Sequence, residues 1–244
     1  KMFLVHELTH RRLVDVGDAD VLMTNIEATF ENVTRMTRQV LDHGALPVVL
    51  GGDHAISFPV VRAFSDPLHV VHFDAHIDYA PFVHGFEYTN SHAFRHIYRM
   101  PHVQTLTQVG IRSLRNPQAW VADSLNDGNR IITMAELKTT SPMELVSRLP
   151  KDASCYVSID IDVLDLPLIP GCVSAEPNGM SYAELRDVLF ALAKHTEIVG
   201  FDLVEVNPQL DIGSGITSYL AAHTILEFLG RICDQPRWIA RRGG

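Results

Sequence analysis

The sequence contains few cysteines and no long apolar run, and each absence excludes a class of protein. Its three cysteines, Cys155, Cys172 and Cys233, are odd in number and far apart, which excludes a disulfide framework and a CxxC zinc site. No apolar run approaches the roughly 18 residues of a membrane-spanning helix. We therefore expect a cytoplasmic protein, kept in a reducing compartment, with no membrane partner.

Basic residues are also scarce. The chain has 20 Lys and Arg against 29 Asp and Glu, a net charge of −9, and no run of Lys or Arg that would form a basic stripe. We therefore expect no nucleic-acid partner, whereas an acidic surface mildly favours a cationic ligand by long-range steering. No repeat, low-complexity tract or linker divides the chain, so we expect a single catalytic domain over residues 1–244.

The first residues lack the strand with which a parallel-sheet enzyme usually starts. Lys1 to Leu4 lead almost at once into an amphipathic helical pattern. We expect that no strand forms within residues 1–15, and that further residues precede Lys1 in the complete protein.

Short continuous apolar runs recur along the chain and predict strands that are buried on both faces, as in a parallel sheet. The runs are Leu46–Leu50, Leu68–Phe73, Thr105–Ile111, Cys155–Val163 and Ile198–Val206. Helical patterns lie between them, and this alternation predicts a three-layer α/β/α fold with a mainly parallel sheet. In such folds, ligands collect beyond the carboxyl ends of the strands.

Three segments carry the apolar spacing of amphipathic helices. The first covers residues 24–43 and is followed by Gly44, where a C-terminal cap belongs. The second is Ser181–His195, whose first residue forms a capping-box signature with Glu184. The third covers Thr217–Leu229.

Residue types that bind metal ions gather at the ends of the predicted strands. They are His54, Asp74, His76, Asp78, Asp160, Asp162 and, at the end of the last strand, Asp202 and Glu205. Side chains two residues apart share one face of an extended chain. We therefore expect Asp74, His76 and Asp78 to converge, and the same spacing applies to Asp160 and Asp162.

Each of these residues alone has an ordinary structural explanation, as a helix cap, a turn former or a hydrogen-bonded core histidine. Together they do not, because burying several carboxylates without cations is prohibitively costly and these segments contain hardly any Lys or Arg. Two divalent ions would neutralise the four negative charges of Asp74, Asp78, Asp160 and Asp162. With the imidazoles of His54 and His76, this mixed oxygen and nitrogen set suits Mn²⁺ or a similar first-row ion.

Four sequence blocks resemble the signature blocks of the arginase/agmatinase (ureohydrolase) family, and they occur in family order. The blocks are GGDHAISFP (51–59), HFDAHID (72–78), SIDIDVLD (158–165) and FDLVEVNP (201–208), and the similarity extends over nearly the whole chain from about Val14. The resemblance implies an arginase-like fold, two divalent metal ions (Mn²⁺, with Ni²⁺ as the alternative) and a trimeric or hexameric homo-oligomer. It also implies hydrolysis of a small cationic guanidino compound with release of urea.

The resemblance assigns metal ligands residue by residue. Both metal ions would share Asp74 and Asp160 as bridging ligands. One ion would also be held by His54 and Asp78, and the other by His76 and Asp162.

The resemblance also assigns three catalytic residues, which would act on a guanidinium carbon that neutral water attacks only slowly. Two metal ions would lower the pKa of a shared water and supply hydroxide near neutral pH. Glu205 would accept the guanidinium through charge-assisted hydrogen bonds, and Asp78 would orient the hydroxide and pass its proton to the departing amine. His92 would either assist that step as a general acid or line the entrance of the site.

Two loops depart from the family pattern, so they leave the substrate open. Ala93 follows the loop histidine where the family usually has Gly, although Phe94 and Arg95 match the agmatinase branch. The segment GCVSAEPNG (171–179) differs from the commoner agmatinase form GTGTPEPGG in its Cys-Val-Ser-Ala stretch. Cys172 in that stretch is interpreted as a packing residue, because no base is paired with it.

Several functions stay open at this point. Agmatinase-like activity leads, and the alternatives are hydrolysis of guanidinobutyrate, of guanidine, or of a biguanide- or guanylurea-type molecule. A substrate with an α-amino acid head would need a clamp that we do not identify. A non-catalytic ureohydrolase-like subunit would be expected to have lost ligands, whereas all six positions are intact. A metallophosphoesterase would need a GNH[DE] block and a late His-x-His, which this sequence does not contain.

Overall fold

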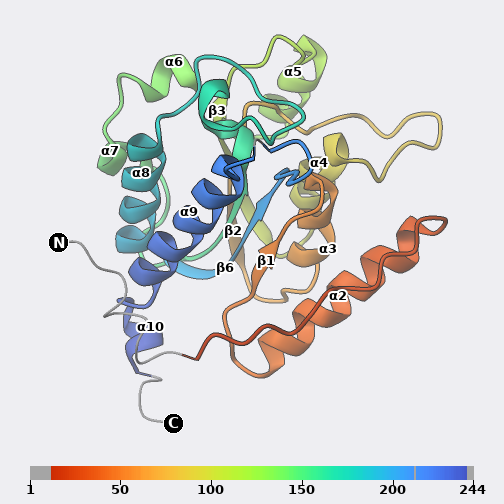
Figure 1. The fold of residues 1–244 in the computed structure, drawn as a ribbon, viewed down its shortest axis with the longest axis vertical. Coiled ribbons are helices and arrows are strands. Elements are labelled where there is room, and N and C mark those ends of the chain that lie inside the picture. Colours follow the sequence, from red (N-terminus) through yellow and green to blue (C-terminus); the bar gives the residue numbers. More distant parts are fainter. Residues whose placement is uncertain (1–11, 212, 241–244) are drawn as a thin grey trace.

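Six parallel strands form one sheet in the part of the chain that the structure describes, residues 12–211 and 213–240 of a computed structural model (Figure 1). The sheet order is β1-β6-β5-β2-β3-β4. The strands are β1 (Val48–Leu50), β2 (Leu68–Phe73), β3 (Val103–Ile111), β4 (Arg130–Thr133), β5 (Ser154–Asp160) and β6 (Glu197–Val204). The expected absence of a strand within residues 1–15 falls mostly on residues 1–11, outside the described residues.

Helices cover both faces of this sheet. On one face lie α6 (Met134–Leu137), α7 (Pro142–Val146), α8 (Tyr182–His195) and α9 (Ile216–Ile232), and on the other lie α2 (Ile26–Asp42), α3 (Ser57–Val61) and α4 (Ala93–Tyr98) (Figure 1). The remaining helices are α5 (Gln118–Asn126), α10 (Pro236–Ile239) and the 3-10 turns η1 (His54–Ile56), η2 (Asn90–His92), η3 (Ile161–Val163) and η4 (Leu166–Leu168). The predicted three-layer α/β/α fold is therefore confirmed.

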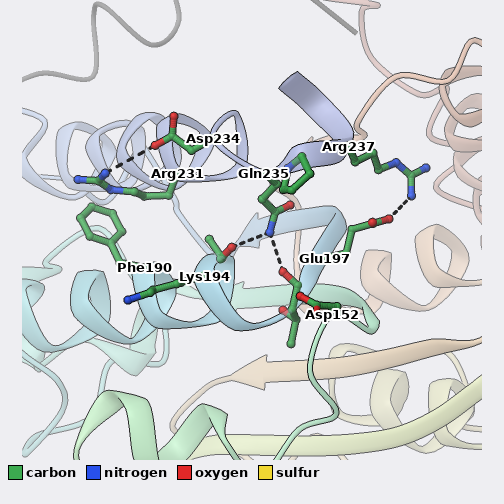
Figure 2. A pocket seen from close by; sticks show the side chains of 11 residues that line it. Asp152, Phe190, Lys194, Glu197, Arg231, Asp234, Gln235 and Arg237 are labelled. Carbon is green, nitrogen blue, oxygen red and sulfur yellow. Dashed lines mark hydrogen bonds and ion pairs between the residues drawn. The ribbon is translucent and has the colours of Figure 1, made fainter. Parts of the chain in front are cut away.

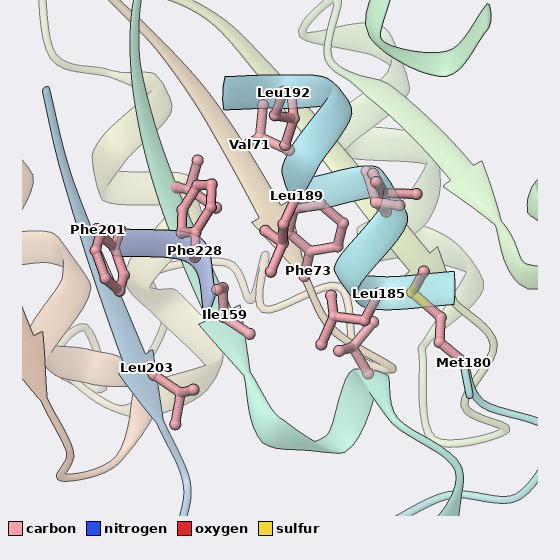
Figure 3. Packing of buried hydrophobic residues seen from close by; sticks show 14 of the residues in the cluster. Val71, Phe73, Ile159, Met180, Leu185, Leu189, Leu192, Phe201, Leu203 and Phe228 are labelled. Atoms are coloured by element: carbon pink, nitrogen blue, oxygen red, sulfur yellow. The ribbon is translucent and has the colours of Figure 1, made fainter. Parts of the chain in front are cut away.

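Alternating side chains of the buried strands pack into two separate hydrophobic cores, one on each face of the sheet. Val71 and Phe73 of β2 pack against Leu189 of α8 on one face (Figure 3). Leu68 and Val70 of the same strand pack in the other core, beneath α2, α3 and α4. Because both faces are covered, these strands are apolar throughout, which explains the continuous runs in the sequence.

The three predicted helices form close to their expected bounds. Asn25 caps α2 by accepting a hydrogen bond from the Ala28 amide, and Gly44 follows the helix with a φ of +66°. The capping box at the start of α8 is present, with Ser181 and Glu184 each bonding the other's backbone amide.

Two strands end earlier than predicted. β5 ends at Asp160 and not at Val163, because the Asp160 carboxylate accepts a hydrogen bond from the Asp162 amide and begins the 3-10 turn η3. β6 ends at Val204, two residues before Val206. The edge strand β4 was not predicted, since Ile131 and Ile132 lie between polar residues and form no long apolar run.

Candidate metal centre

The register of the parallel sheet brings the polar residues to one edge. Ser158 of β5 lies opposite His72 of β2 on one side and Asp202 of β6 on the other. Asp74 directly follows β2, and Asp160 is the last residue of β5. The site therefore lies beyond the carboxyl ends of the central strands, where parallel sheets collect ligands.

Two imidazoles lie among the carboxylates of this edge. His54 Nδ1 is 3.0 Å from Asp74 Oδ2, 3.2 Å from Asp160 Oδ2 and 3.4 Å from Asp78 Oδ2. His76 Nδ1 is 2.8 Å from an Asp162 oxygen and 3.3 Å from Asp74 Oδ1. The two groups share Asp74, so the structure brings all six predicted metal-ligating residues together.

Turns, and not strand alternation, produce this convergence. Asp74 accepts a hydrogen bond from the His76 amide, and Asp160 does the same for the amide of Asp162. Asp78 has a φ of +43°, in the left-handed region that non-glycine residues rarely adopt. The expectation that an extended chain aligns these side chains is therefore wrong, although the residues it selected do meet.

A glycine allows the neighbouring strand to approach. Gly110, near the end of β3, has a φ of +98°, and a Cβ there would lie 2.8 Å from a Val163 methyl and 3.0 Å from the Asp74 carbonyl oxygen. Any other residue would push β3 away from the turn that carries Asp74.

Burial and charge crowding shift the pKa values of the residues in this cluster. Burial, together with the charge of Asp74, raises the pKa of Asp78 and of Asp162, the latter to about 6. Although burial opposes it, the hydrogen bonds that the imidazole donates to Asp162 and Asp74 raise the pKa of His76 to about 11. Carboxylates that repel one another in a buried site favour bound cations. The physical chemistry of the cluster thus matches the donor set of a divalent metal centre.

The donor atoms also fit metal ions in their spacing. Three groups each gather ligand atoms within 4.8 Å of one another: His54, His72, Asp74 and Asp78; Asp74, His76 and Asp162; and Asp160, Asp162 and Cys172. Shared aspartates connect the groups, as in sites where one carboxylate serves two ions. Burial raises the pKa of the Cys172 thiol to about 12, which agrees with its interpretation as a packing residue.

A chain of buried hydrogen bonds holds the imidazole of His54 on the side away from the carboxylates. His54 Nε2 lies 2.8 Å from Ser158 Oγ, and this hydroxyl donates to Asp202 at 2.7 Å. Asp202 also accepts a hydrogen bond from the Tyr156 hydroxyl at 2.6 Å. A metal-binding imidazole is commonly oriented in this way through its second nitrogen, so Asp202 acts behind the site and not within it.

Glu205 takes a bent backbone directly after β6. Its φ is +66°, its amide donates to the Gly52 carbonyl, and its Oε1 accepts a 2.9 Å hydrogen bond from the His54 amide. Glu205 therefore leaves the line of β6 and turns toward His54. Glu205 lies next to the cluster without joining its donor groups, and burial raises the pKa of its carboxyl.

His92 lies at the end of η2, which packs against η1, the turn that begins with His54. Its Nδ1 is 2.7 Å from the Thr89 hydroxyl, and burial lowers its pKa. Within the described residues, no hydrogen bond or ion pair joins His92 to the six predicted metal-ligating residues, which agrees with a position outside the cluster.

The outer edge of the cluster carries an arginine that the sequence analysis did not identify. Arg115 has a side chain that is 60% exposed, and its Nη2 lies 3.1 Å from His76 Nε2. It also donates to a Glu176 oxygen at 3.0 Å and to the Ser174 carbonyl at 3.0 Å. No apolar or motif context marks such an exposed residue in a sequence.

A second arginine, Arg112, forms hydrogen bonds with backbone carbonyls of two segments at this edge, residues 162–164 and 176–177. Arg112 donates to the carbonyl oxygens of Asp162 and Glu176, each at 2.8 Å, and to those of Pro177 at 2.9 Å and Leu164 at 3.1 Å. These carbonyls belong to the irregular segments that follow β5, so one guanidinium supplies partners for backbone groups that no strand pairs.

A cavity of about 560 Å³ lies at the opposite, amino-terminal edge of the sheet, between α8, α10 and the start of β6 (Figure 2). Four of its charged residues form ion pairs, Arg237 with Glu197 and Arg231 with Asp234. The side chain of Gln235 donates to two backbone carbonyls there. The cavity shares no residue with the metal-ligand cluster, which remains the site of chemistry.

The fold and the cluster define a metal-dependent α/β hydrolase, and comparison with known proteins gives the family. A model described as the Arginase family matches residues 2–230. The chain belongs to this family and is a hydrolase of C–N bonds in amidine or guanidino groups, with a binuclear metal site. In the described part of the chain, no helix is long and apolar enough to cross a membrane.

Similar proteins extend over most of the chain. A formimidoylglutamase of Halalkalibacterium halodurans is 33% identical over 239 residues, covering 93% of this chain and 74% of the relative. Arginase 1 of Arabidopsis thaliana is 33% identical over 237 residues, covering 91% and 67%. The structure of proclavaminate amidino hydrolase from Streptomyces clavuligerus superposes with a TM-score of 0.86 at 28% identity, covering 95% of this chain and 78% of that one.

Proposed function

We propose that this protein hydrolyses a small guanidino compound and releases urea. The observation that carries the proposal is the pair of imidazole–carboxylate groups that meet at Asp74, with the Glu205 carboxyl beside them. Such an arrangement supports a role for Glu205 as guanidinium acceptor next to a site for two cations.

The two ions would be held by the six clustered side chains. His54, Asp74, Asp78 and Asp160 would bind one ion, and Asp74, His76, Asp160 and Asp162 the other. The mixture of carboxylate oxygens and imidazole nitrogens favours Mn²⁺, with Ni²⁺ as the alternative. When bound, the metal pair supplies a nucleophile by lowering the pKa of water.

Three residues would act on the substrate. Glu205 binds the guanidinium through charge-assisted hydrogen bonds, and its tie to the His54 amide fixes its position. Asp78 orients the attacking group and carries its proton to the departing amine. His92, held by the Thr89 hydroxyl, lies on the neighbouring turn and donates a proton to the leaving group.

Agmatine is the first candidate substrate, because the sequence blocks and Phe94-Arg95 resemble the agmatinase branch. The relatives that are 33% identical are a formimidoylglutamase and an arginase, so the tail of the substrate needs a direct test. The outer edge carries Glu176, whose Oε1 lies 3.6 Å from His76 Nε2. A cationic tail would approach this carboxylate.

A second candidate, 4-guanidinobutyrate, is favoured by Arg115. This guanidinium uses Nε and Nη2 for Glu176, Ser174 and His76, and among the described residues no partner is found for its Nη1. An arginine with free donors at the outer edge suits a substrate carboxylate, which it can bind through charge-assisted hydrogen bonds.

A screen of guanidino compounds tests the proposal. Protein loaded with Mn²⁺ or with Ni²⁺ is given agmatine, 4-guanidinobutyrate, guanidine, a biguanide and guanylurea, and released urea is measured. We expect urea from agmatine or from 4-guanidinobutyrate. Protein that holds two ions per chain and releases no urea from any of them would contradict the proposal and favour a non-catalytic subunit. Sedimentation of the same samples tests the expected trimer or hexamer.

A further inference from the structure

One buried histidine lies against the metal cluster without a role in the function proposed above. His72 is fully buried, and its Nε2 lies 2.7 Å from Asp74 Oδ2. Its ring stacks on Phe94, with centroids 3.5 Å apart, so it cannot turn freely. It could be a metal ligand, a core residue, or a group that positions Asp74, and its hydrogen bonds distinguish these roles.

The orientation of the Gln108 side-chain amide determines which of these roles His72 can have. Its Nε2 is 2.6 Å from the Ile77 carbonyl oxygen, which can only accept, so the amide nitrogen and not the amide oxygen faces that way. On the other side its Oε1 accepts a 2.8 Å hydrogen bond from the Ser124 hydroxyl, and Asn129 donates to that hydroxyl at 3.2 Å. Gln108, Ser124 and Asn129 are all buried, so water does not compete with this arrangement.

The fixed amide in turn fixes the proton of His72. The second hydrogen of the Gln108 amide points at His72 Nδ1, 3.1 Å away, so Nδ1 must accept. The proton of the neutral ring is then on Nε2, and it is donated to Asp74. A nitrogen that carries a proton cannot bind a metal ion, which excludes His72 as a ligand.

We propose that His72 is a positioning residue for the carboxylate of Asp74, kept in its Nε2–H form by Gln108, Ser124 and Asn129. The inference rests on the metal site proposed above, because Asp74 is the carboxylate that both ions share. By occupying one direction around Oδ2, the His72 donor fixes which way the remaining lone pairs point. Partners of this kind typically contribute 10- to 100-fold to metal affinity.

Nuclear magnetic resonance tests the proton position without activity. In ¹⁵N-histidine-labelled protein free of metal, two-bond ¹H–¹⁵N correlations distinguish the two neutral forms and the imidazolium. The His72 signals are those lost in His72→Phe. We expect the neutral Nε2–H pattern at neutral pH. The Nδ1–H pattern, or an imidazolium, would overturn the proposal.

Mn²⁺ affinity, measured by competition with a chelator, tests the positioning. His72→Phe keeps the ring against Phe94 and removes both nitrogens, so affinity should fall about 10- to 100-fold, whereas His72→Gln restores an N–H donor and should recover most of it. Gln108→Glu turns the donor facing Nδ1 into an acceptor, and Gln108→Met is its matched control, since both remove the bond to Ile77. We expect Gln108→Glu to weaken Mn²⁺ binding more than Gln108→Met.

Each outcome of the affinity measurements decides the question. Wild-type Mn²⁺ affinity in His72→Phe, or equal affinities in the two Gln108 variants, would overturn the proposal. If His72→Phe does not fold, as judged by near-ultraviolet circular dichroism, the Gln108 pair gives the answer. Failure of the proposed function would be separate, because it shows as wild-type protein that binds metal and releases no urea.

Discussion

The inner and outer parts of the site are built in different ways. Asp74 and Asp162 are fully buried, and Asp160 is 3% exposed. These residues stand on or directly after central strands, and buried hydrogen-bond partners hold them from behind. The outer part consists of irregular loops, where Arg115 is 60% exposed and Glu176 is 17% exposed. The comparison suggests that metal binding is fixed by the sheet, whereas choice of substrate depends on side chains that can change without disturbing it.

The largest loss should follow a change in the inner part. Asp160→Ala removes a carboxylate expected to bind both ions, so turnover should be abolished and metal content should fall. Asp160→Asn keeps the shape and serves as the matched control. Elemental analysis and urea release measure the two effects. Retention of both ions in Asp160→Ala would show that the inner residues are less essential than their burial suggests.

His92→Ala should lower kcat on the order of 100-fold while metal content stays at the wild-type level, because loss of a general acid typically costs that much or more. Thr89→Val, which removes the hydroxyl 2.7 Å from His92 Nδ1, should give a smaller loss in the same direction. Loss of metal from His92→Ala would place this residue in the inner part of the site.

Glu205→Gln should reduce kcat/KM for the guanidino substrate at least tenfold with both ions bound. The substitution keeps the shape and removes a charge, which weakens a charge-assisted hydrogen bond by about 1.5–3 kcal/mol. Steady-state kinetics on metal-loaded protein measures it. Near-native turnover would remove the basis for guanidinium recognition and reopen the class of substrate.

Arg115→Gln should change preference and not metal binding. Replacing the cation at the outer edge should weaken kcat/KM for 4-guanidinobutyrate by about fivefold to tenfold relative to agmatine, which corresponds to about 1–1.4 kcal/mol for one exposed charge-assisted contact. The ratio of the two values cancels any general loss of activity. An unchanged ratio would mean that Arg115 serves the loop and not the substrate.

The smallest effect is expected at Cys172, where the two parts meet. Cys172→Ala should leave turnover close to wild type and lower the free energy of unfolding by about 1 kcal/mol, because a small buried group is lost. Urea denaturation and the urea-release assay give the two values. A large loss of turnover with unchanged stability would assign the thiol a chemical role.

The inner part of the site was largely predictable from the sequence, because its signals are local. A buried strand needs a continuous apolar run, and an Asp or His at its end is conspicuous. The runs that end at Leu50 and Phe73 predict the ends of β1 and β2, and the sequence also indicates the six predicted metal-ligating residues that cluster in the structure. The prediction of the local backbone was wrong at the end of β5. The turn η3 forms there in place of an extended strand, because the Asp160 carboxylate caps this turn.

The rest depends on contacts between distant segments, which no window of sequence contains. Gln108 orients His72 only because β3 lies beside β2, and Ser124 reaches Gln108 from α5. His72 looked like an ordinary strand residue, and β4 was too short and too exposed to give an apolar signal. Arg115 belongs to the same class, because an exposed arginine in a loop acquires meaning only from its neighbours.

Arg112 affects which residues near the site can be substituted during evolution. The loop of residues 171–179 has little regular structure, yet carbonyls within it and just before it are held by one guanidinium that belongs to another segment. The conformation of this loop therefore depends on a residue outside it. Exposed side chains of the loop, such as Val173, can therefore change while Arg112 holds the backbone, whereas Gly171 and Gly179 are fixed by close contacts with Asp211 and Leu164. A loop transplanted into another protein would need an arginine in the same place to keep this path.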